Sequence, residues 1–250
     1  MSDELEKNSI LLKNPWLSDV KIFAESESTQ KDAKLDNQEN CLYMTERQLA
    51  TYGRFGRQYF AAEDGGIYMS LMLHPSVSTD RLPNYTLLTG AAVVSAIEKL
   101  TDKKPQIKWV NDIYLGQKKF VGILAEASVN ADKIPQIIIG VGINFSIHDF
   151  PEELSEKATS LFANEQPTVT RSELVAEIWS EFHRLSDGNF FDIYKAHSFI
   201  LGKQVEFTQS GKDYIGIATD LTAAGELIVD LFNGQQKVLS SGEISLKKWT

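Results

Sequence analysis

Two glycine–arginine pairs, Gly53-Arg54 and Gly56-Arg57, lie three residues apart in a stretch that has no clear hydrophobic period. Arginine binds phosphate through two parallel hydrogen bonds, and glycine lets the backbone approach a ligand closely. Such a segment becomes ordered and closes only when its ligand binds. The pattern indicates a loop that binds a polyanion, with a solvated basic loop as the alternative.

A second candidate segment combines lysine, asparagine and aspartate beside short strands. Lys108, Asn111 and Asp112 stand together, and Lys118 and Lys119 follow across a turn. These groups could hold a triphosphate and its Mg²⁺. The alternative is a hairpin with a solvated Asn-Asp turn and a lysine-rich tip. Lys119 lies where the polar turn meets an apolar strand, which favours an inward-pointing side chain.

The third candidate segment is Gly140-Val141-Gly142-Ile143-Asn144. It lacks the third glycine and the following helix of a dinucleotide-binding fingerprint, so we exclude that function. Its glycines would let a flat base or substrate lie against the strand, and Asn144 could bind a base edge; a close-packed core strand is the alternative. The four histidines have no metal-ligand spacing, and no catalytic triad can be inferred.

Composition places these segments in an ordinary globular protein. The 250 residues are 42% hydrophobic and 24% charged, enough for one large domain or a medium and a small one. The net charge of −9 argues against nucleic-acid binding. Cys41 is the single cysteine, so no internal disulfide can form, and we predict a buried strand position for it. No signal peptide or membrane span is recognisable, which predicts a cytoplasmic protein.

The elements that must position the candidate residues are strands and helices in mixed order. Alternation over 20–23 and short, largely apolar runs over 41–45, 67–73, 107–110, 113–115, 120–126 and 136–143 predict strands, with a hairpin turn at Gly116-Gln117. Helices are predicted over 87–100 and 190–199. A third helix opens at the capping box from Thr170 to Glu173, with Leu174, Ile178, Phe182 and Leu185 on one face. This order predicts a mainly antiparallel α+β core.

The last 50 residues differ in texture from the rest. Short strands over 205–207, 214–218, 227–231 and 237–239 are separated by turns that contain glycine. This pattern predicts a small β-barrel domain after Gly202.

Weak separately, the segments occur in an order that resembles the biotin–protein ligase family. The matching segments are Ser28-Thr29-Gln30, Gln48 with Gly53 to Arg57, Lys108 to Asp112, Lys119 to Glu126, and Gly140 to Asn144. The tail, with Leu201-Gly202-Lys203 and Ser241 to Leu246, looks like that family's C-terminal domain. The resemblance covers the chain from about Asn14 to its C-terminus.

The resemblance implies a class II aminoacyl-tRNA synthetase-like catalytic core over residues 1–200 and an SH3-like β-barrel over 201–250. It implies biotin and ATP with Mg²⁺ as reactants, and the biotin carboxyl carrier domain of a carboxylase as partner. A homodimer is common among relatives. Some members carry an N-terminal DNA-binding domain; only about a dozen residues precede the match here, so we expect the short form without DNA binding.

The resemblance also assigns roles to residues. Biotin would contact Ser28, Thr29, Gln30, Gln48, Tyr52, Gly53, Arg54, Lys119, Gly122 and Leu124. ATP would contact Arg54, Arg57, Lys108, Asn111, Lys119 and Asn144. The catalytic residues would be Lys119, Arg54 and Asp112. Lys119 would bridge the biotin carboxylate and the α-phosphate, and Asp112 is our hypothesis for the group that orients or deprotonates the acceptor lysine. No protein metal site is predicted.

Three departures from the family pattern affect the loop. Thr51-Tyr52 replaces the first pair of the usual Gly-Arg-Gly-Arg-x-Gly-Arg, Val110 replaces proline, and Tyr59 replaces tryptophan. The first change either weakens retention of the intermediate or lets Tyr52 pack over the ligand. Three alternatives remain: a lipoate–protein ligase, whose Gly-Gly-Gly run and adjacent histidine are missing; a non-catalytic biotin or nucleotide sensor; and a protein-binding α+β module.

Overall fold

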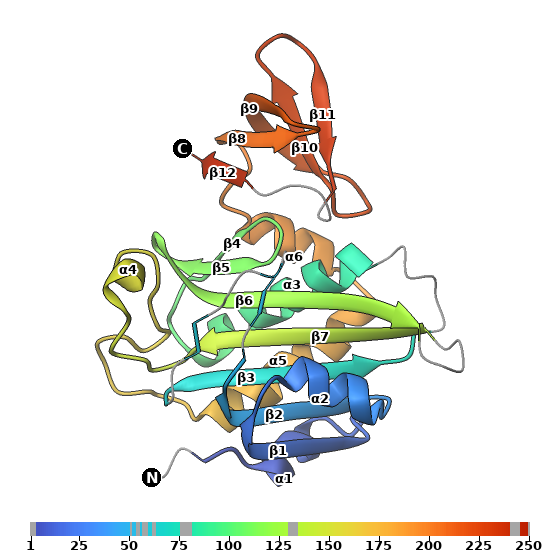
Figure 1. Ribbon diagram of the computed structural model, residues 1–250, viewed down its shortest axis with the longest axis vertical. Helices are drawn as coiled ribbons and strands as arrows, with labels where there is room; N and C mark the ends of the chain where they lie inside the picture. The colour runs from blue at the N-terminus through green and yellow to red at the C-terminus, as the bar shows by residue number, and fades with distance from the viewer. Residues whose placement is uncertain are drawn as a thin grey trace.

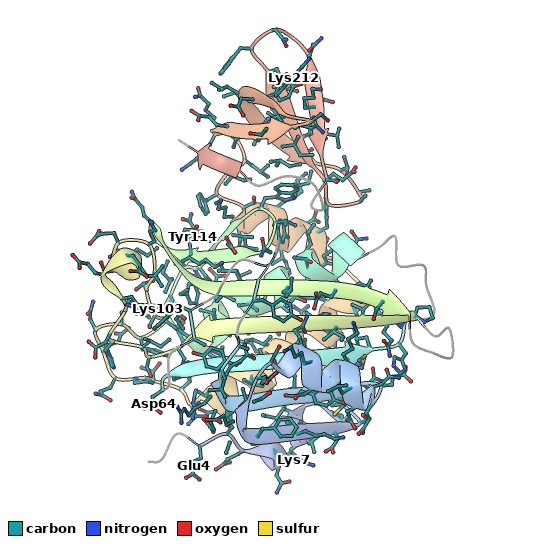
Figure 2. The ribbon with its side chains drawn as sticks, viewed as in Figure 1. Glu4, Lys7, Asp64, Lys103, Tyr114 and Lys212 are labelled. Atoms are coloured by element: carbon teal, nitrogen blue, oxygen red, sulfur yellow. The ribbon has the colours of Figure 1, made fainter. Side chains whose placement is uncertain are left out.

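Two β-sheets organise the chain in the computed structural model (Figure 1). The structure describes residues 4–50, 52, 53, 56, 60, 61, 64–75, 82–129, 135–240 and 246–249. A seven-stranded sheet forms the larger part of the molecule, and a five-stranded sheet of the C-terminal residues lies beyond one edge of it. In Figure 2, Lys7 and Lys212 mark opposite ends of the molecule, and Tyr114 lies in the part of the large sheet that is nearer the C-terminal sheet.

The large sheet has the order β1-β2-β3-β7-β6-β5-β4. Its strands are β1 (Asp19–Ser26), β2 (Cys41–Gln48), β3 (Gly66–Leu73), β4 (Gln106–Lys108), β5 (Asp112–Leu115), β6 (Lys118–Val129) and β7 (Pro135–Asn144). β1 and β2 are parallel, and the other neighbouring pairs are antiparallel. The predicted α+β core with a mainly antiparallel sheet is therefore confirmed.

Helices cover the two faces of this sheet unequally (Figure 1). The helices are α1 (Lys7–Lys13), α2 (Thr29–Asp36), α3 (Leu82–Leu100), α4 (Glu152–Ser155), α5 (Arg171–Ser186) and α6 (Phe190–His197). The short helix α2 lies in front of the sheet, whereas α3 and α5 lie behind it. The front face is thus only partly covered by helix, and the back face carries the main core.

Alternation of side chains along β7 explains the two faces. Ile137, Ile139, Val141 and Ile143 belong to the main core, whereas Ile138 packs in a separate small cluster with Ala33 of α2. Because successive side chains of a strand point to opposite faces, Gly140 and Gly142 share the α2 face with Ile138. By the same rule, the position of a residue along a strand determines whether its side chain faces the core or the α2 face.

Helix α5 begins as the sequence predicts. The Thr170 side chain accepts a hydrogen bond from the Glu173 N–H, and the Glu173 carboxylate accepts one from the Thr170 N–H, which completes the capping box. Its predicted apolar face is buried, and Trp179 of the same helix has no exposed surface. The helix therefore anchors the back layer against the sheet.

Glu177 of α5 is a buried carboxylate held by two lysines. Its side chain is 1% exposed and forms ion pairs with Lys13 of α1 and with Lys99 of α3, the latter at 2.6 Å. Burial raises the pKa of Glu177, but the two lysines outweigh burial, and the net direction is downward. Ionised Glu177 therefore contributes stability above the carboxyl pKa of the unfolded chain, and this contribution is lost as the pH falls through the lower folded pKa.

We expect Glu177→Gln to lower the free energy of unfolding by about 1–2 kcal/mol at pH 7, because the lysines lose their partner. The difference from the wild type should shrink as the pH falls below the ordinary carboxyl pKa, and it should vanish below the lower folded pKa, where the carboxyl of the folded wild type is neutral too. Denaturant unfolding between pH 3 and pH 8 measures this. Glu153→Gln on exposed α4 removes the same charge and serves as control. A pH-independent difference would contradict the assignment.

The C-terminal sheet has the order β11-β10-β9-β8-β12. Its strands are β8 (Gln204–Gln209), β9 (Lys212–Leu221), β10 (Leu227–Leu231), β11 (Gln236–Leu239) and β12 (Leu246–Trp249). All neighbouring pairs are antiparallel, as the small barrel requires. The strand β12 was not predicted, because four residues with two lysines give no alternation signal.

Several element boundaries differ from the sequence-based ones. The strand predicted over 107–110 ends at Lys108, because Trp109 and Val110 turn into the core, and the helix predicted over 190–199 ends at His197. Cys41 is buried as predicted, and burial raises the pKa of its thiol. Among the described residues, no helix has the length and apolar composition that a membrane crossing requires.

Candidate functional site

On the α2 face of the large sheet, glycines of β6 and β7 lie side by side. We call this area, formed by Gly122, Gly140 and Gly142, the glycine floor. On β6 and β7, Gly122 pairs with Gly142, and Leu124 pairs with Gly140. The carboxamide of Gln30 lies across Gly140, so close that a Cβ atom there would be 3.1 Å from the Gln30 side chain. Glycine at this point lets a polar side chain of α2 approach the strand backbone.

The start of α2 holds a cluster of polar groups against this floor. The Gln48 Oε1 accepts hydrogen bonds from the Thr29 N–H at 3.2 Å and from the Thr29 hydroxyl at 3.3 Å. The Thr29 and Ser70 hydroxyls lie 2.7 Å apart. Ser28 is the buried N-cap residue of α2, but its side chain makes no capping hydrogen bond. Ser28, Thr29 and Gln48, all predicted to bind biotin, are therefore brought together.

Gln30 and Tyr52 meet at the same end of the site. Both donate to Glu126 Oε2, from the Gln30 amide at 2.8 Å and from the Tyr52 hydroxyl at 3.2 Å. Burial and the neighbouring Glu126 carboxylate raise the pKa of Tyr52 to about 12, so its phenol is a hydrogen-bond donor at neutral pH. The Tyr52 hydroxyl thus lies at the same end of the site as the Gln30 amide. Glu126 stood in the matched segment, but the sequence assigned it no role.

At the other end of β6, Lys119 forms an ion pair with Asp112 of the neighbouring strand β5. The Lys119 Nζ lies 2.6 Å from Asp112 Oδ1, and both side chains are partly buried. Asp112 pairs with Gly122 in the strand register and so lies on the α2 face. An ammonium on this face can neutralise an anion bound over the glycine floor.

A β-bulge decides that Lys119 reaches this face. Ile113 pairs with Val121, whereas Tyr114 pairs with Lys119, so Phe120 is an extra residue on β6. Strict alternation would have pointed Lys119 into the core beside Val121 and Ile123. The bulge reverses the alternation: Phe120 is buried in the core, and Lys119 turns to Asp112.

The turn between β4 and β5 is braced from three sides. The Asn111 amide donates to the Ile123 carbonyl at 2.9 Å, and the Ile123 N–H donates to the Asn111 carbonyl at 2.9 Å. The Tyr194 hydroxyl of α6 donates to the Val110 carbonyl. The Trp109 indole N–H donates at 2.9 Å to the carbonyl of Gly225, in the turn between β9 and β10. The turn that precedes Asp112 is thus fixed by β6, by α6 and by the C-terminal part of the chain.

Two further predicted ATP contacts lie at strand ends. Lys108 ends β4 and pairs with Asp112 in the strand register. Asn144 ends β7; its amide donates to the Thr159 carbonyl at 3.1 Å, and its buried Oδ1 finds no hydrogen-bond partner among the described residues. An acceptor in this state fits a donor from a ligand, such as an exocyclic amino group.

Arg54 and Arg57, both predicted to contact ATP, lie outside the described residues, as do Thr51 and Tyr59. Gly53 is described and half-buried, and its carbonyl accepts from the Gly56 N–H. The described site therefore has a polar end at α2, a glycine floor with Leu124, and an ion pair at Lys119.

The described residues contain no group of three or more His, Cys, Asp or Glu side chains that could hold a metal ion. Mg²⁺ binds proteins through one or two carboxylates together with substrate phosphates. Such an ion fits this face only as part of a metal–nucleotide complex, with Asp112 as the nearest described carboxylate to Lys119.

Comparison with known proteins identifies relatives over most of the chain. The biotin/lipoate A/B protein ligase family model matches residues 23–144, and the biotin protein ligase C-terminal domain model matches residues 200–247. The bifunctional ligase/repressor BirA of Bacillus subtilis strain 168 is 32% identical over 232 residues, which are 86% of this chain and 70% of that protein. The biotin–[acetyl-CoA-carboxylase] ligase of Mycobacterium tuberculosis is 27% identical, over 89% of this chain and 87% of its own length.

A solved structure agrees with the fold. The biotin protein ligase from Aquifex aeolicus in complex with biotin and ATP has a TM-score of 0.78 and 26% sequence identity, over 93% of this chain and all of that chain. The fold, the two family models and the level of identity agree with each other. This chain belongs to the biotin protein ligase family.

Proposed function

We propose that this chain activates biotin with ATP as biotinyl-5′-AMP and transfers the biotinyl group to a lysine of a biotin carboxyl carrier protein. The observation that carries the proposal is the Lys119–Asp112 ion pair, which the bulge at Phe120 turns onto the face that holds the polar cluster of α2. Relatives that are ligases by name, and the Aquifex aeolicus enzyme solved with biotin and ATP, support it.

The order of the residues along β6 supports a defined orientation of biotin. The polar ring of biotin would lie at the start of α2, where Ser28, Thr29 and Gln48 offer hydroxyl and amide groups. Its apolar chain would lie over Gly122 and Leu124. The carboxylate would then point toward Lys119 at the far end of the strand.

The first step joins two anions, so charge neutralisation is its main requirement. An oxygen of the biotin carboxylate attacks the α-phosphorus of ATP, the new P–O bond forms, and the bond to pyrophosphate breaks. Lys119 would stand between the carboxylate and the α-phosphate and would lower their repulsion. Mg²⁺, carried by ATP, would neutralise charge on the leaving pyrophosphate. Besides Lys119, the proposed ATP contacts among the described residues are Lys108, Asn111 and Asn144. Asn111 also braces the turn between β4 and β5.

The second step transfers the biotinyl group. The amine of the acceptor lysine attacks the carbonyl carbon of the mixed anhydride, the amide bond forms, and the C–O bond to AMP breaks. The amine must be neutral to attack, and Asp112 is the proposed group that orients it or accepts its proton. Arg54 and Arg57 are proposed to bind phosphate.

The alternatives are less well supported. A lipoate–protein ligase shares the first family model, but the match of residues 200–247 to the biotin protein ligase C-terminal domain favours biotin. A non-catalytic sensor would not require the ion pair of Lys119 on the ligand face.

The test is transfer of labelled biotin to a purified carrier domain in the presence of ATP and Mg²⁺. We expect labelling that needs ATP, that unlabelled biotin competes away, and that lipoate does not. Labelling with lipoate instead would support the lipoate ligase. Biotin binding without ATP–pyrophosphate exchange would support the sensor and contradict the proposal.

Wider properties of the protein remain proposals. We propose a catalytic domain over residues 1–200 and an SH3-like domain over 201–250, a division that the two family matches support. A cytoplasmic location and a homodimer are also proposed. The net charge of −9 supports a ligase that does not bind DNA. Light scattering would test the homodimer, and a titration with DNA would test the absence of DNA binding.

A further inference from the structure

Glu126 is a carboxylate that the proposed reaction does not use. It lies on β6, on the same face as Gly122 and Leu124, and it is half-buried. A single oxygen, Oε2, accepts from the Gln30 amide at 2.8 Å and from the Tyr52 hydroxyl at 3.2 Å. The three residues come from α2, from the segment after β2 and from β6, and they converge only in the fold.

The first consequence concerns the orientation of the Gln30 amide. A carboxylate can only accept hydrogen bonds, so it binds the NH₂ side of the amide and leaves the oxygen on the other side. Gln30 Oε1 is buried over Gly140 and has no hydrogen-bond partner among the described residues. Glu126 therefore sets which polar atom of Gln30 the biotin end of the site presents, namely an acceptor that suits an N–H donor.

The second consequence concerns the segment that carries Tyr52. Its beginning is fixed beside α2, because the Leu49 N–H donates to the Ser26 carbonyl and the Ala50 N–H donates to the Glu27 carbonyl, both at 2.9 Å. Tyr52 then reaches across to β6 through its hydroxyl. The bond to Glu126 joins this segment to the strand that forms the floor.

We propose that Glu126 is a positioning residue of the biotin end of the site, which it orders by fixing the amide of Gln30 and anchoring the hydroxyl of Tyr52. This inference rests on the proposed function, because it names biotin as the ligand. Glu126 lies away from the proposed reacting groups: Lys119 is near the opposite end of β6, and its ion-pair partner Asp112 is on β5. Loss of Glu126 should therefore weaken biotin binding and leave ATP binding and the chemical step nearly unchanged.

The experiment compares Glu126→Ala, Glu126→Gln and Tyr52→Phe with the wild type. Glu126→Ala removes both hydrogen bonds, and we expect biotin Kd and biotin KM to rise by about 10- to 50-fold. Tyr52→Phe removes one bond and keeps Gln30 oriented, and we expect a rise of about 3- to 10-fold. Glu126→Gln keeps one acceptor oxygen, and we expect its biotin Kd to lie between those of Glu126→Ala and Tyr52→Phe. The ATP KM and kcat should stay within about twofold in all three.

Tyr43→Phe is the matched control. Tyr43 also donates its hydroxyl to a carboxylate, that of Asp36, on the α2 face, but this pair lies outside the site. We expect this variant to lose stability and to keep the wild-type biotin Kd. Thermal unfolding of each variant separates folding defects from binding defects, and Tyr52→Phe tests the idea if Glu126→Ala does not fold.

Biotin Kd is measured by calorimetry, which needs no turnover. The inference would be overturned if the Glu126→Ala and Tyr52→Phe variants both had a biotin Kd within twofold of the wild-type value. An ATP KM that rises as much as the biotin KM would also overturn it. A wild type that binds biotin but does not transfer it would contradict the proposed function alone, because the ratio of biotin Kd values still tests Glu126. A wild type that binds no biotin would overturn both.

Discussion

Lys119→Ala is expected to reduce ATP-dependent biotin transfer by about two to three orders of magnitude, the usual effect of removing one preorganised group that stabilises transition-state charge. The reason is the position of its ammonium, which pairs with Asp112 on the face that binds the reactants in our proposal. Without it, the carboxylate of biotin meets the α-phosphate with less compensation of charge. ATP–pyrophosphate exchange in the presence of biotin should fall by the same factor, because this assay reports the first step.

Lys118→Ala is the matched control for Lys119→Ala. Lys118 is the adjacent residue on β6, but its ammonium donates to the Ser155 carbonyl and lies on the α4 side of the hairpin. We expect this variant to keep exchange and transfer within about twofold of the wild type. Equal losses in the two variants would show a general effect of charge, and a Lys119→Ala enzyme with wild-type exchange would remove Lys119 from the mechanism.

Trp109→Ala should be the most destabilising single change at the site. The Trp109 side chain is 4% exposed and belongs to the main core, and its indole N–H donates to the buried Gly225 carbonyl. Removing a buried tryptophan costs about 3–5 kcal/mol of unfolding free energy. Trp109→Phe should cost about 1–3 kcal/mol, because it mainly leaves the Gly225 carbonyl without its partner. Denaturant unfolding measures both values.

The same change should also affect catalysis. Trp109 opens the turn that leads to Asp112, so a shift of this turn displaces the ion-pair partner of Lys119. We expect folded Trp109→Phe to transfer biotin about tenfold more slowly, since small displacements of a positioned group are costly. Trp16→Phe removes another partly buried indole, which donates to Asn14, and should keep the transfer rate. If the Trp109→Phe variant transferred biotin at the wild-type rate, the contact between Trp109 and Gly225 would stabilise the fold without affecting catalysis.

Much of the architecture was predictable because it depends on local patterns. The apolar run from Ile137 to Ile143 predicted a buried strand, and the capping box at Thr170 predicted where α5 begins. The mixed order of strands and helices indicated the antiparallel α+β core, and the short strands after Gly202 indicated the second sheet. Each of these signals lies within about ten neighbouring residues, which is the range over which side-chain periodicity acts.

Other features were not predictable from local patterns. The strand predicted through Val110 ends earlier because Trp109 is drawn toward Gly225, a residue more than a hundred positions away. Local sequence patterns cannot predict the contact between Trp109 and Gly225, because they extend over only a few neighbouring residues. Glu126 belongs to a segment that matches the family, but the sequence assigned it no role. Its partners Gln30 and Tyr52 come from distant parts of the chain, and only the fold brings them to it.

By itself, then, the sequence determined the element types, the family resemblance and the residue types at the site. Tertiary structure decided which of those residues face one another. Lys119 is the clearest case: strict alternation from Val121 points it into the core, and the extra residue Phe120 turns it to Asp112. A bulge forms when pairing with a neighbouring strand fixes the register, so the direction of this side chain depends on β5 as well as on β6.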